Sequence, residues 1–347
     1  MVTLVNKVIK EKDSNFTMEA IEATGQYQKI ALLVREWVEI HKGESFDLDM
    51  ICRQLQIQER TNRKYVAIEL SKIVGKGTLE KVTSPIHKPL YRYIDNTCKY
   101  IDWVNASSSD VLDIKWPYGV EDDSRFGFDG RVKISPGDIV VVAGTSNMGK
   151  TAFCLNFLWE NMDAYSCTLM GNEYTPGKFK RRVSKMTWRE PINDKGESKF
   201  ELIERREGWK DIIRPDNINI IDWINLSDKF YEIGKIIEDI QARLHSGIAL
   251  ISIQKDEHKT RGFGGGFSEH LASLYLSIDY ERLTILKAKE WAEWNPNGKM
   301  YGFKIVNGGT KFHNIRLLRK CKSCWGSGRG KGGQCEPCNG TGYVDDN

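Results

Sequence analysis

The stretch from residue 138 to residue 151, DIVVVAGTSNMGKT, constrains the fold of this chain more than any other. Five apolar residues, Ile139–Ala143, lead into a loop with the pattern G-x-x-x-x-G-K-[ST]. This pattern predicts a buried strand, a loop whose backbone N–H groups surround an anion, and a helix that begins at the phosphates. The alternative is a chance match in a turn. The strand before the loop, the helix after it and the complete Lys-Thr ending argue against chance.

Each part of this phosphate-binding loop has an expected task. Lys150 reaches the β- and γ-phosphates of a nucleotide, and the Thr151 hydroxyl binds Mg²⁺. We therefore predict ATP and Mg²⁺ as cofactors. The predicted nucleotide-binding residues are Gly144, Thr145, Ser146, Asn147, Met148, Gly149, Lys150 and Thr151.

Length and composition limit the other possibilities. A chain of 347 residues typically forms about two or three domains, and a hydrophobic content of 40% supports buried cores. The formal net charge is only +4, so local basic clusters must carry any argument for nucleic-acid binding. No apolar run is long enough to span a membrane, and the N-terminus lacks the features of a signal peptide.

The eight cysteines fall into two groups. Cys52, Cys98, Cys154 and Cys167 lie in apolar segments, which predicts buried thiols. The other four are grouped near the C-terminus with the spacing of metal ligands. A reducing compartment suits both groups.

The C-terminal cysteines form two C-x-x-C-x-G-x-G units. Four thiolates with this spacing suit one tetrahedral Zn²⁺, and the glycines allow backbone N–H groups to turn toward sulfur. The units resemble the zinc repeats of DnaJ-type chaperones, with two units instead of four. A redox dithiol is the alternative, but both pairs carry the same glycine-rich continuation. The predicted zinc ligands are Cys321, Cys324, Cys335 and Cys338.

The pattern of apolar residues in segment 20–98 predicts a small domain of three helices and two strands. The predicted helices span Gln26–Ile40, Phe46–Leu55 and Gln58–Val74, and the predicted strands span Leu79–Val82 and Leu90–Ile94. Three helices followed by a hairpin resemble a winged-helix domain. This resemblance implies that DNA is contacted by residues of the third helix and of the wing. These are Arg60, Asn62, Arg63 and Lys64 on the helix, and His87 and Lys88 on the wing. The alternative is a helical protein-interaction domain with a solvated basic face.

After the phosphate-binding loop, a second apolar strand ends in a carboxylate at Glu173. A proline-containing turn and an arginine-rich helix at residues 178–186 follow. This arrangement resembles the RecA-like ATPases, and among them the core of the hexameric replicative helicases. The resemblance covers roughly Phe126–Leu318 and is closest to replication and repair ATPases of phages and other mobile elements. It implies an α/β fold with a mostly parallel sheet, and Glu173 as the base that activates the attacking water.

Physical chemistry supports the same positions. A general base must lie near the γ-phosphate, and parallel strands bring their carboxyl ends to one edge of the sheet. The strand from Asn217 to Ile221 ends in Asp222, which we predict to hold Mg²⁺. For Glu173, the alternative is an ordinary helix-capping residue.

The resemblance also implies a sensor and a DNA-binding loop. In RecA-like proteins, the strand that here ends in Gln254 carries a polar residue that senses the γ-phosphate. The following loop, residues 255–267, is basic, rich in glycine and interrupted by phenylalanine. The alternative is a plain surface loop. The residues predicted to contact phosphates are Lys255, Lys259 and Arg261, and those predicted to stack on a base are Phe263 or Phe267.

The last predicted strands span Leu283–Lys287 and Met300–Val306. In helicase relatives, the first of these strands ends in Lys and Arg residues that reach a neighbouring subunit's γ-phosphate. Here Lys287 and Lys289 stand at that place, without an arginine. A lysine lacks the bidentate fork of arginine, so the sequence argues against a ring that depends on this contact.

The sequence thus predicts five parts and two candidate functions. The parts are an N-terminal arm (1–19), a winged-helix-like domain (20–98), a linker (99–124), an ATPase core (125–318) and a zinc-binding tail (319–347). The first function is a helicase or translocase on single-stranded DNA in replication or repair. The second is an ATP-dependent DNA-binding switch that loads or regulates a partner. Expected partners are single-stranded DNA, further copies of the chain and replication proteins, in the cytoplasm or at the nucleoid of an infected cell.

Overall fold

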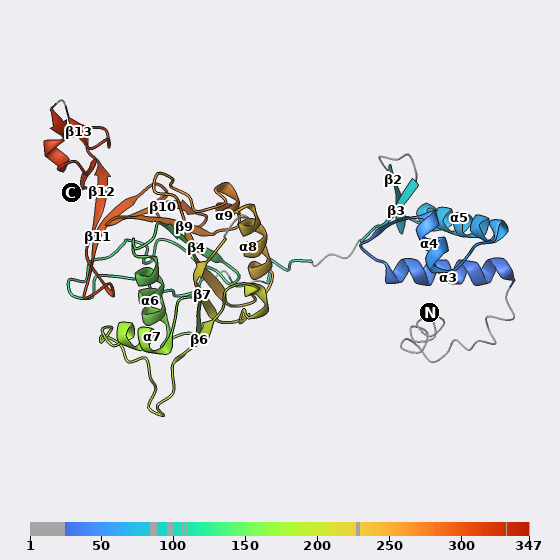
Figure 1. Cartoon of the computed structure of the whole chain (residues 1–347), viewed down its shortest axis with the longest axis horizontal. Coiled ribbons are helices and arrows are strands. Elements are labelled where there is room, and N and C mark those ends of the chain that lie inside the picture. Colours follow the sequence, from blue (N-terminus) through green and yellow to red (C-terminus); the bar gives the residue numbers. More distant parts are fainter. Residues whose placement is uncertain are drawn as a thin grey trace. The chain divides into compact units, whose positions relative to one another are not determined.

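The computed structural model describes residues 25–83, 89–95, 100–105, 107, 110–226, 230–330 and 332–346. The predicted N-terminal arm, Cys98, and the wing residues His87 and Lys88 lie outside these ranges. The chain divides into two compact units at Ala106 and Ser107 (Figure 1), and each is described by itself. Among the described residues, no helix has the length and apolar character needed to cross a membrane.

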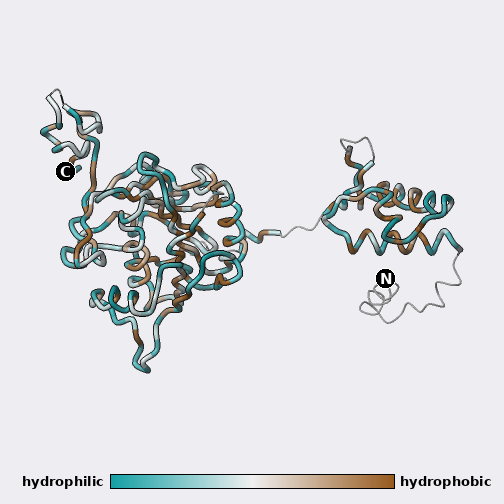
Figure 2. The backbone as a smooth tube through the Cα atoms, viewed as in Figure 1, coloured by the Kyte–Doolittle hydropathy of each residue, from teal (hydrophilic) through white to brown (hydrophobic). Residues whose placement is uncertain are grey.

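The N-terminal unit contains three helices and a small antiparallel sheet. Its elements are α3 (Gln26–Ile40), β1 (Ser45–Asp47), α4 (Leu48–Gln54), α5 (Arg60–Gly75), β2 (Leu79–Thr83) and β3 (Pro89–Tyr93), with the strand order β1-β3-β2. Apolar and polar residues alternate along the helices in Figure 2, as expected for helices with one buried face. Their buried residues, such as Val34, Ile51 and Leu70, form one core.

The second predicted helix begins later than expected. Residues 45–47 form β1 instead, in which Phe46 lies opposite Tyr91 on β3 and stacks on its ring. The helix then starts after Asp47, whose side chain accepts a hydrogen bond from the Met50 N–H at 2.7 Å. Pairing with a distant strand therefore decided the start of this helix, together with a local cap.

A buried carboxylate joins α3 to α5. Glu69 is 1% exposed, and its oxygens accept hydrogen bonds from Arg35 Nε at 2.7 Å and the Tyr27 hydroxyl at 2.8 Å. Burial favours the neutral acid, but these two donors hold the pKa of Glu69 below its usual value. The ionised Glu69 therefore stabilises this unit at neutral pH.

The C-terminal unit is built on one mixed sheet of ten strands, in the order β15-β12-β11-β10-β9-β4-β8-β7-β5-β6. Its strands are β4 (Ile139–Gly144), β5 (Cys167–Gly171), β6 (Phe200–Glu204), β7 (Ile218–Ile224), β8 (Ile248–Gln254), β9 (Leu274–Asp279), β10 (Arg282–Ala288), β11 (Met300–Val306), β12 (Lys311–Lys320) and β15 (Tyr343–Asp345). From β9 to β6 neighbouring strands are parallel, and from β9 to β15 they are antiparallel. The predicted α/β class is confirmed.

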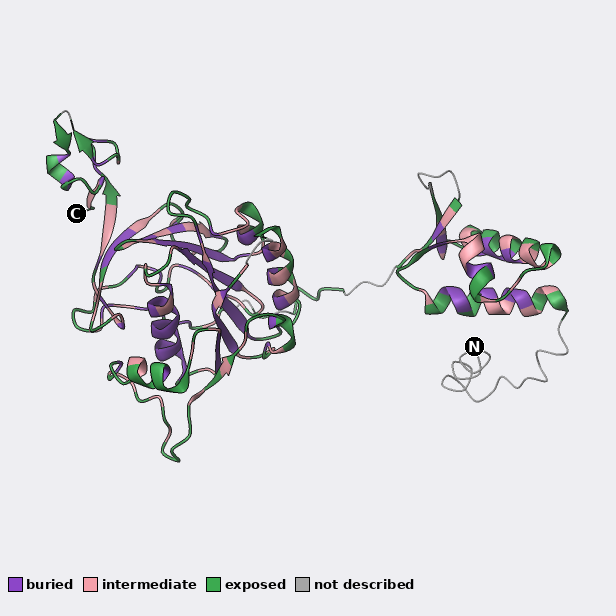
Figure 3. Cartoon of the chain, in the orientation of Figure 1, coloured by how far each residue is buried: buried purple, intermediate pink, exposed green. Residues whose placement is uncertain are grey.

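Two layers of helix cover this sheet. The helices are α6 (Lys150–Asn161), α7 (Pro176–Val183), α8 (Ile233–Gln241) and α9 (Gly266–His270), with 3₁₀ turns at Trp209–Asp211, Phe230–Glu232 and Glu336–Cys338. Alternate residues of β4 pack into different cores: Val140 and Val142 with α6, and Ile139 and Val141 with α8. Both β4 and α6 are almost entirely buried in Figure 3. The loop that was predicted to bind phosphates thus lies between two buried elements.

Part of the predicted linker belongs to this unit. The Leu112 N–H donates to the Ile134 carbonyl, and the Lys115 N–H donates to Asn161 Oδ1. Ile114 and Trp116 are buried in the same core as α6. The part of the predicted linker after residue 110 therefore packs on the sheet unit through its apolar side chains.

Four strands of the sheet, β6, β9, β12 and β15, were not expected from the sequence, and β9 and β12 are the longest of them. Residues 311–320 are largely polar, and β12 has exposed as well as buried positions, so its hydrophobic signal is weak. Strand β9 is almost entirely buried between β4 and β10, and its six residues follow the short helix α9 closely. Both strands depend on pairing with neighbours rather than on a pattern of their own.

The C-terminal cysteines lie in a small module attached to the sheet. It contains the hairpin of β13 (Arg329–Gly330) and β14 (Gly333–Gln334). Strand β15 returns beside the end of β12, pairing Tyr343 with Lys320. The module is therefore held at both ends by one strand pair.

Candidate functional site

The loop between β4 and α6 contains residues with a left-handed backbone conformation. Asn147 and Gly149 have φ values of 60° and 108°, in the left-handed region. A Cβ atom at Gly149 would lie 2.6 Å from the Ile305 side chain, and one at Gly144 would lie 3.0 Å from the Ile278 carbonyl oxygen. Glycine at position 149 is therefore required by its positive φ, and the backbone carbonyl of Ile278 crowds Gly144. Helix α6 begins directly after the loop.

Lys150 lies inside this loop. Its Nζ donates hydrogen bonds to the carbonyl oxygens of Gly144 at 2.9 Å and Thr145 at 2.8 Å. The residue is 7% exposed, and burial lowers the pKa of Lys150, while the nearby Asp222 carboxylate opposes that shift. The arrangement holds a buried positive charge at the start of a helix.

Asp222 lies on β7 and is 3% exposed. Its two carboxylate oxygens accept hydrogen bonds from the Tyr174 hydroxyl at 2.6 Å and from the Ser252 hydroxyl at 3.0 Å. Burial raises the pKa of Tyr174, with the neighbouring Asp222 charge adding to the effect. A Cβ atom at Gly171 would lie 2.6 Å from the Tyr174 ring, so only glycine leaves room for this contact.

Neither partner of Asp222 was predicted from the sequence. Ser252 lies in the middle of an apolar strand, and Tyr174 directly follows Glu173, the residue expected to act as the base. No local pattern distinguishes them from ordinary core residues. Only the pairing of β5, β7 and β8 brings the three side chains together.

Glu173 and Thr151 line the same pocket as Asp222. This pocket has a volume of about 410 Å³ and also includes Arg182 and Arg206. Glu173 is exposed, and its Oε1 accepts a hydrogen bond from Trp223 Nε1 at 3.3 Å. The structure therefore brings together three residues that were predicted from three separate stretches of the sequence.

Gln254 connects the end of β8 to the phosphate-binding loop. Its Nε2 donates to the Ser146 hydroxyl at 2.9 Å. The predicted sensor thus contacts the loop that it is expected to monitor.

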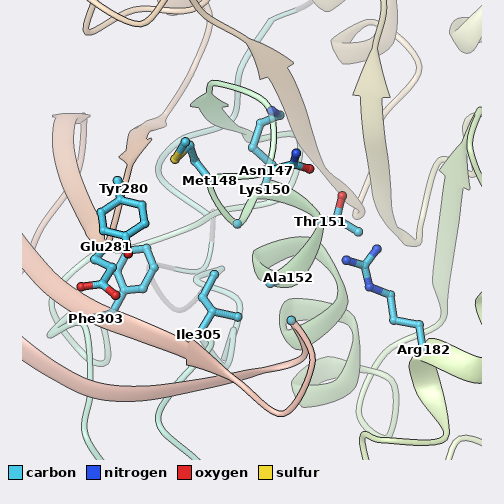
Figure 4. A pocket seen from close by; sticks show the side chains of 12 residues that line it. Asn147, Met148, Lys150, Thr151, Ala152, Arg182, Tyr280, Glu281, Phe303 and Ile305 are labelled. Carbon is cyan, nitrogen blue, oxygen red and sulfur yellow. The ribbon is translucent and has the colours of Figure 1, made fainter.

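A second pocket, of about 390 Å³, also lies against the loop (Figure 4). Its lining includes Tyr280 from the β9–β10 turn and Phe303 and Ile305 from β11. Arg182 lines both pockets, and in Figure 4 its side chain extends toward Thr151. The sequence did not predict any of these four residues at the site, because no motif marks them.

The structure corrects one predicted DNA contact. Lys255 is 4% exposed and forms an ion pair with Asp279, and its Nζ also donates to the Lys259 carbonyl oxygen. A buried lysine that is already paired stabilises the loop and has no surface for a phosphate. The sequence could not show this, because Asp279 lies on β9.

The other predicted loop residues are more accessible. Lys259 is exposed and pairs with Asp256, a neighbour on the same loop. Arg261 is half-exposed and pairs with Glu269. The Phe263 ring packs on Phe230, with ring centroids 4.4 Å apart, whereas Phe267 is 64% exposed.

The two candidate trans-acting lysines already have contacts within the chain. Lys287 Nζ donates to the carbonyl oxygens of Glu269 at 2.8 Å and His270 at 3.0 Å, at the end of α9. Burial and the neighbouring Lys289 lower the pKa of Lys287. Lys289 Nζ lies 3.5 Å from the Leu271 carbonyl oxygen. Their positive charges therefore stabilise a helix end.

On α5 the predicted DNA contacts separate into two groups. Arg63 forms an ion pair with Asp49, and Asn62 hydrogen-bonds with Gln26 and Glu59. Arg60 and Lys64 are exposed, and neither forms an ion pair with any described residue. A basic face of two residues therefore remains on this helix.

The four C-terminal cysteines meet as predicted. All are buried, and their Sγ atoms lie within 4.8 Å of one another. The Sγ atoms of Cys321 and Cys335 are 3.9 Å apart, and those of Cys324 and Cys338 are 3.6 Å apart. Zn–S bonds of about 2.3 Å in a tetrahedron place the sulfurs about 3.8 Å apart. The cluster therefore fits one Zn²⁺.

The surroundings of the thiols also suit a cation. Burial disfavours a thiolate, but N–H groups of Gly328 and Gly326 hold the pKa of Cys324 below its usual value. Burial and the neighbouring thiols raise the pKa of Cys335. Four thiols this close cannot all ionise without a compensating positive charge, which a bound metal supplies.

We expect the purified chain to carry about one Zn²⁺, because four buried thiols with this spacing form a closed structural site. Elemental analysis after preparation under reducing conditions measures this content. Cys324→Ser should lose the zinc, whereas Cys52→Ala, in the N-terminal unit, should retain it. Absence of zinc from both the parent chain and Cys52→Ala would contradict the assignment.

The chain was compared with protein-family models and with curated proteins. No protein-family model matches this chain, and no curated protein matches it. The functional assignment therefore depends on the residues and geometry described above.

Proposed function

We propose that the C-terminal unit is an ATPase that couples nucleotide hydrolysis to single-stranded DNA. The observation that carries this proposal is the pocket shared by Thr151, Glu173 and Asp222 beside the phosphate-binding loop. A hydroxyl and a carboxylate suit Mg²⁺, which prefers oxygen ligands, and a second carboxylate is available as a base. These groups come from α6, from the turn after β5 and from β7, which are far apart in sequence.

Each group has a distinct task in the proposed reaction. Backbone N–H groups of the loop and the Lys150 ammonium bind the phosphates and stabilise the negative charge that grows in the transition state. Thr151 and Asp222 are the residues that would hold Mg²⁺, which screens the phosphate charge. Glu173 accepts the proton of the attacking water. Arg182 lies in the same chain and adds a second positive charge near Thr151.

The second pocket offers a place for the rest of the nucleotide. Tyr280, which is 76% exposed, provides an aromatic ring beside the phosphate-binding loop, and the half-buried Ile305 adds apolar surface. Such surface suits a nucleobase, which stacks on aromatic rings. This pocket supports the assignment of a nucleotide, and inorganic phosphate alone would leave it empty.

DNA binding is the second half of the proposal. The loop after Gln254 presents Lys259 and Arg261, and the exposed Arg60 and Lys64 lie on α5 of the N-terminal unit. The Gln254–Ser146 hydrogen bond links the DNA loop to the phosphate-binding loop. Loss of the γ-phosphate can change that contact and so alter the grip on DNA.

A second candidate function is favoured by the contacts of Lys287. Because its ammonium already binds two carbonyl groups of its own chain, it is poorly placed to reach a neighbour's nucleotide. An ATPase without a trans-acting contact suits a switch that loads or regulates a partner on DNA. This function uses the same ATP site, but ATP hydrolysis does not separate DNA strands.

Strand displacement separates the two functions. The full chain is mixed with ATP, Mg²⁺ and a forked duplex that carries a fluorophore and a quencher, and the rise in fluorescence is followed. A motor should separate the strands in an ATP-dependent reaction, whereas a switch should hydrolyse ATP and leave the fork intact. Failure to hydrolyse ATP with or without DNA would contradict both functions.

A further inference from the structure

The cysteine module displays one side chain that its fold does not explain. Trp325 follows the second cysteine of the first unit and is 86% exposed, more than any other tryptophan among the described residues. Its φ of 54° lies in the left-handed region, which bulky residues rarely adopt. The backbone strain is therefore not compensated by packing of the indole.

The second cysteine unit shows what the backbone itself requires. Asn339 occupies the equivalent position after Cys338 and has a similar φ of 46°. Asparagine adopts this conformation at low cost, because its short polar side chain tolerates the left-handed region. A cysteine unit of this kind thus forms without an aromatic residue, so the indole at position 325 serves another purpose.

Three basic residues lie within five positions of this indole in the sequence. Lys320, Lys322 and Arg329 are exposed, and none forms an ion pair with a described residue. A Cβ atom at Gly326 would lie 3.4 Å from Lys320 Cδ, so the lysine side chain lies directly beside the Trp325 turn. The two C-terminal aspartates are already neutralised, since Asp345 pairs with Arg316 and Asp346 pairs with Arg319.

We propose that this surface binds single-stranded nucleic acid. The indole of Trp325 stacks on an unpaired base, and Lys320, Lys322 and Arg329 contact the adjacent phosphates. Stacking on an exposed aromatic ring combined with nearby cations is how proteins bind single strands without reading their sequence. The site lies outside the ATP pocket and does not depend on the proposed hydrolysis.

The alternative partner, a protein, fits the surface less well. Trp325 is the one large hydrophobic side chain that is exposed among the described residues of the tail. The centre of a protein interface contains several apolar residues, whereas one base needs only one ring. The exposed positive charges also match a phosphate backbone.

Trp325→Asn tests the proposal without disturbing the fold. The substitution gives the first C-x-x-C-x-G-x-G unit the residue that the second one has at this position, and asparagine suits the left-handed backbone. Zinc content should therefore be unchanged, and the melting temperature should be equal or higher. Affinity of the full chain for a fluorescein-labelled oligothymidylate, measured by anisotropy without ATP, should fall about 5- to 100-fold. Trp325→Phe should retain most of the affinity.

Two controls complete the experiment. Trp103→Asn removes an exposed indole from the N-terminal unit and should leave the affinity unchanged. Lys320→Ala combined with Lys322→Ala should reduce the slope of log K against log salt by about 0.7 for each phosphate that the protein no longer neutralises. ATP hydrolysis without DNA should be the same in all of these variants, which separates this site from the ATP site.

Two outcomes would overturn the proposal. One is an unchanged affinity for the oligothymidylate in Trp325→Asn at full zinc content. The other is displacement of the oligothymidylate by blunt duplex DNA, or by an unfolded peptide, as effectively as by unlabelled single strand, since neither competitor presents an unpaired base.

Discussion

Replacement of Lys150 with Ala should abolish ATP hydrolysis by this chain. Lys150 Nζ is the buried positive charge inside the phosphate-binding loop, where it donates to the carbonyl oxygens of Gly144 and Thr145. Its charge stabilises the transition state more than the ground state, so turnover should fall by at least about 10²–10³-fold. The measurement is steady-state phosphate release with saturating ATP and Mg²⁺.

Two further variants separate chemistry from folding. Lys150→Met keeps most of the buried side-chain volume and removes the charge, so it should lose activity with little change in melting temperature. Lys195→Ala removes an exposed lysine far from the loop in sequence and should hydrolyse ATP normally. A normal turnover number in Lys150→Met would remove the basis of the nucleotide assignment.

Glu173→Gln should bind ATP and hardly turn it over. The amide keeps the size of the side chain and its contact with Trp223, but it cannot accept a proton from water. Loss of a general base typically lowers the rate by about 10²–10⁴-fold. Because Glu173 is exposed, the melting temperature should be almost unchanged. Single-turnover hydrolysis and binding of a fluorescent ATP analogue measure the two effects separately.

The matched control for this variant is Glu207→Gln, an exposed carboxylate outside both pockets. It should behave like the parent chain. Asp222→Asn should weaken the Mg²⁺ dependence and also disturb the hydrogen bonds from Tyr174 and Ser252. If Asp222→Asn is inactive while Glu173→Gln remains active, the base has been assigned to the wrong carboxylate.

Local patterns predicted several elements of both units well. The helix at Gln26–Ile40 and the strand at Met300–Val306 have the predicted bounds. The apolar run before the phosphate-binding loop forms β4, and α6 begins at Lys150. These features depend on periodicity, on glycine and on neighbours in the chain, all of which are visible in the sequence.

Contacts between distant strands were not visible in the same way. Lys255 was predicted to bind DNA, but it is buried and β9 places Asp279 beside it. Tyr174 and Ser252 become partners of Asp222 only when β5, β7 and β8 lie side by side. The pockets beside the loop form because α7, the β9–β10 turn and β11 converge on it.

The sequence by itself determined the phosphate-binding loop and the two cysteine units of this protein. In each, the decisive residues lie within about a dozen positions, and glycines permit the backbone shape that the ligand needs. Only the tertiary structure decided which side chains are available to a ligand. Lys255 and Lys287 bind groups of their own chain, whereas Trp325 is exposed and Lys320 lies beside its turn. The reason is that burial and ion pairing depend on which strands become neighbours, and that order arises from the packing of the whole sheet.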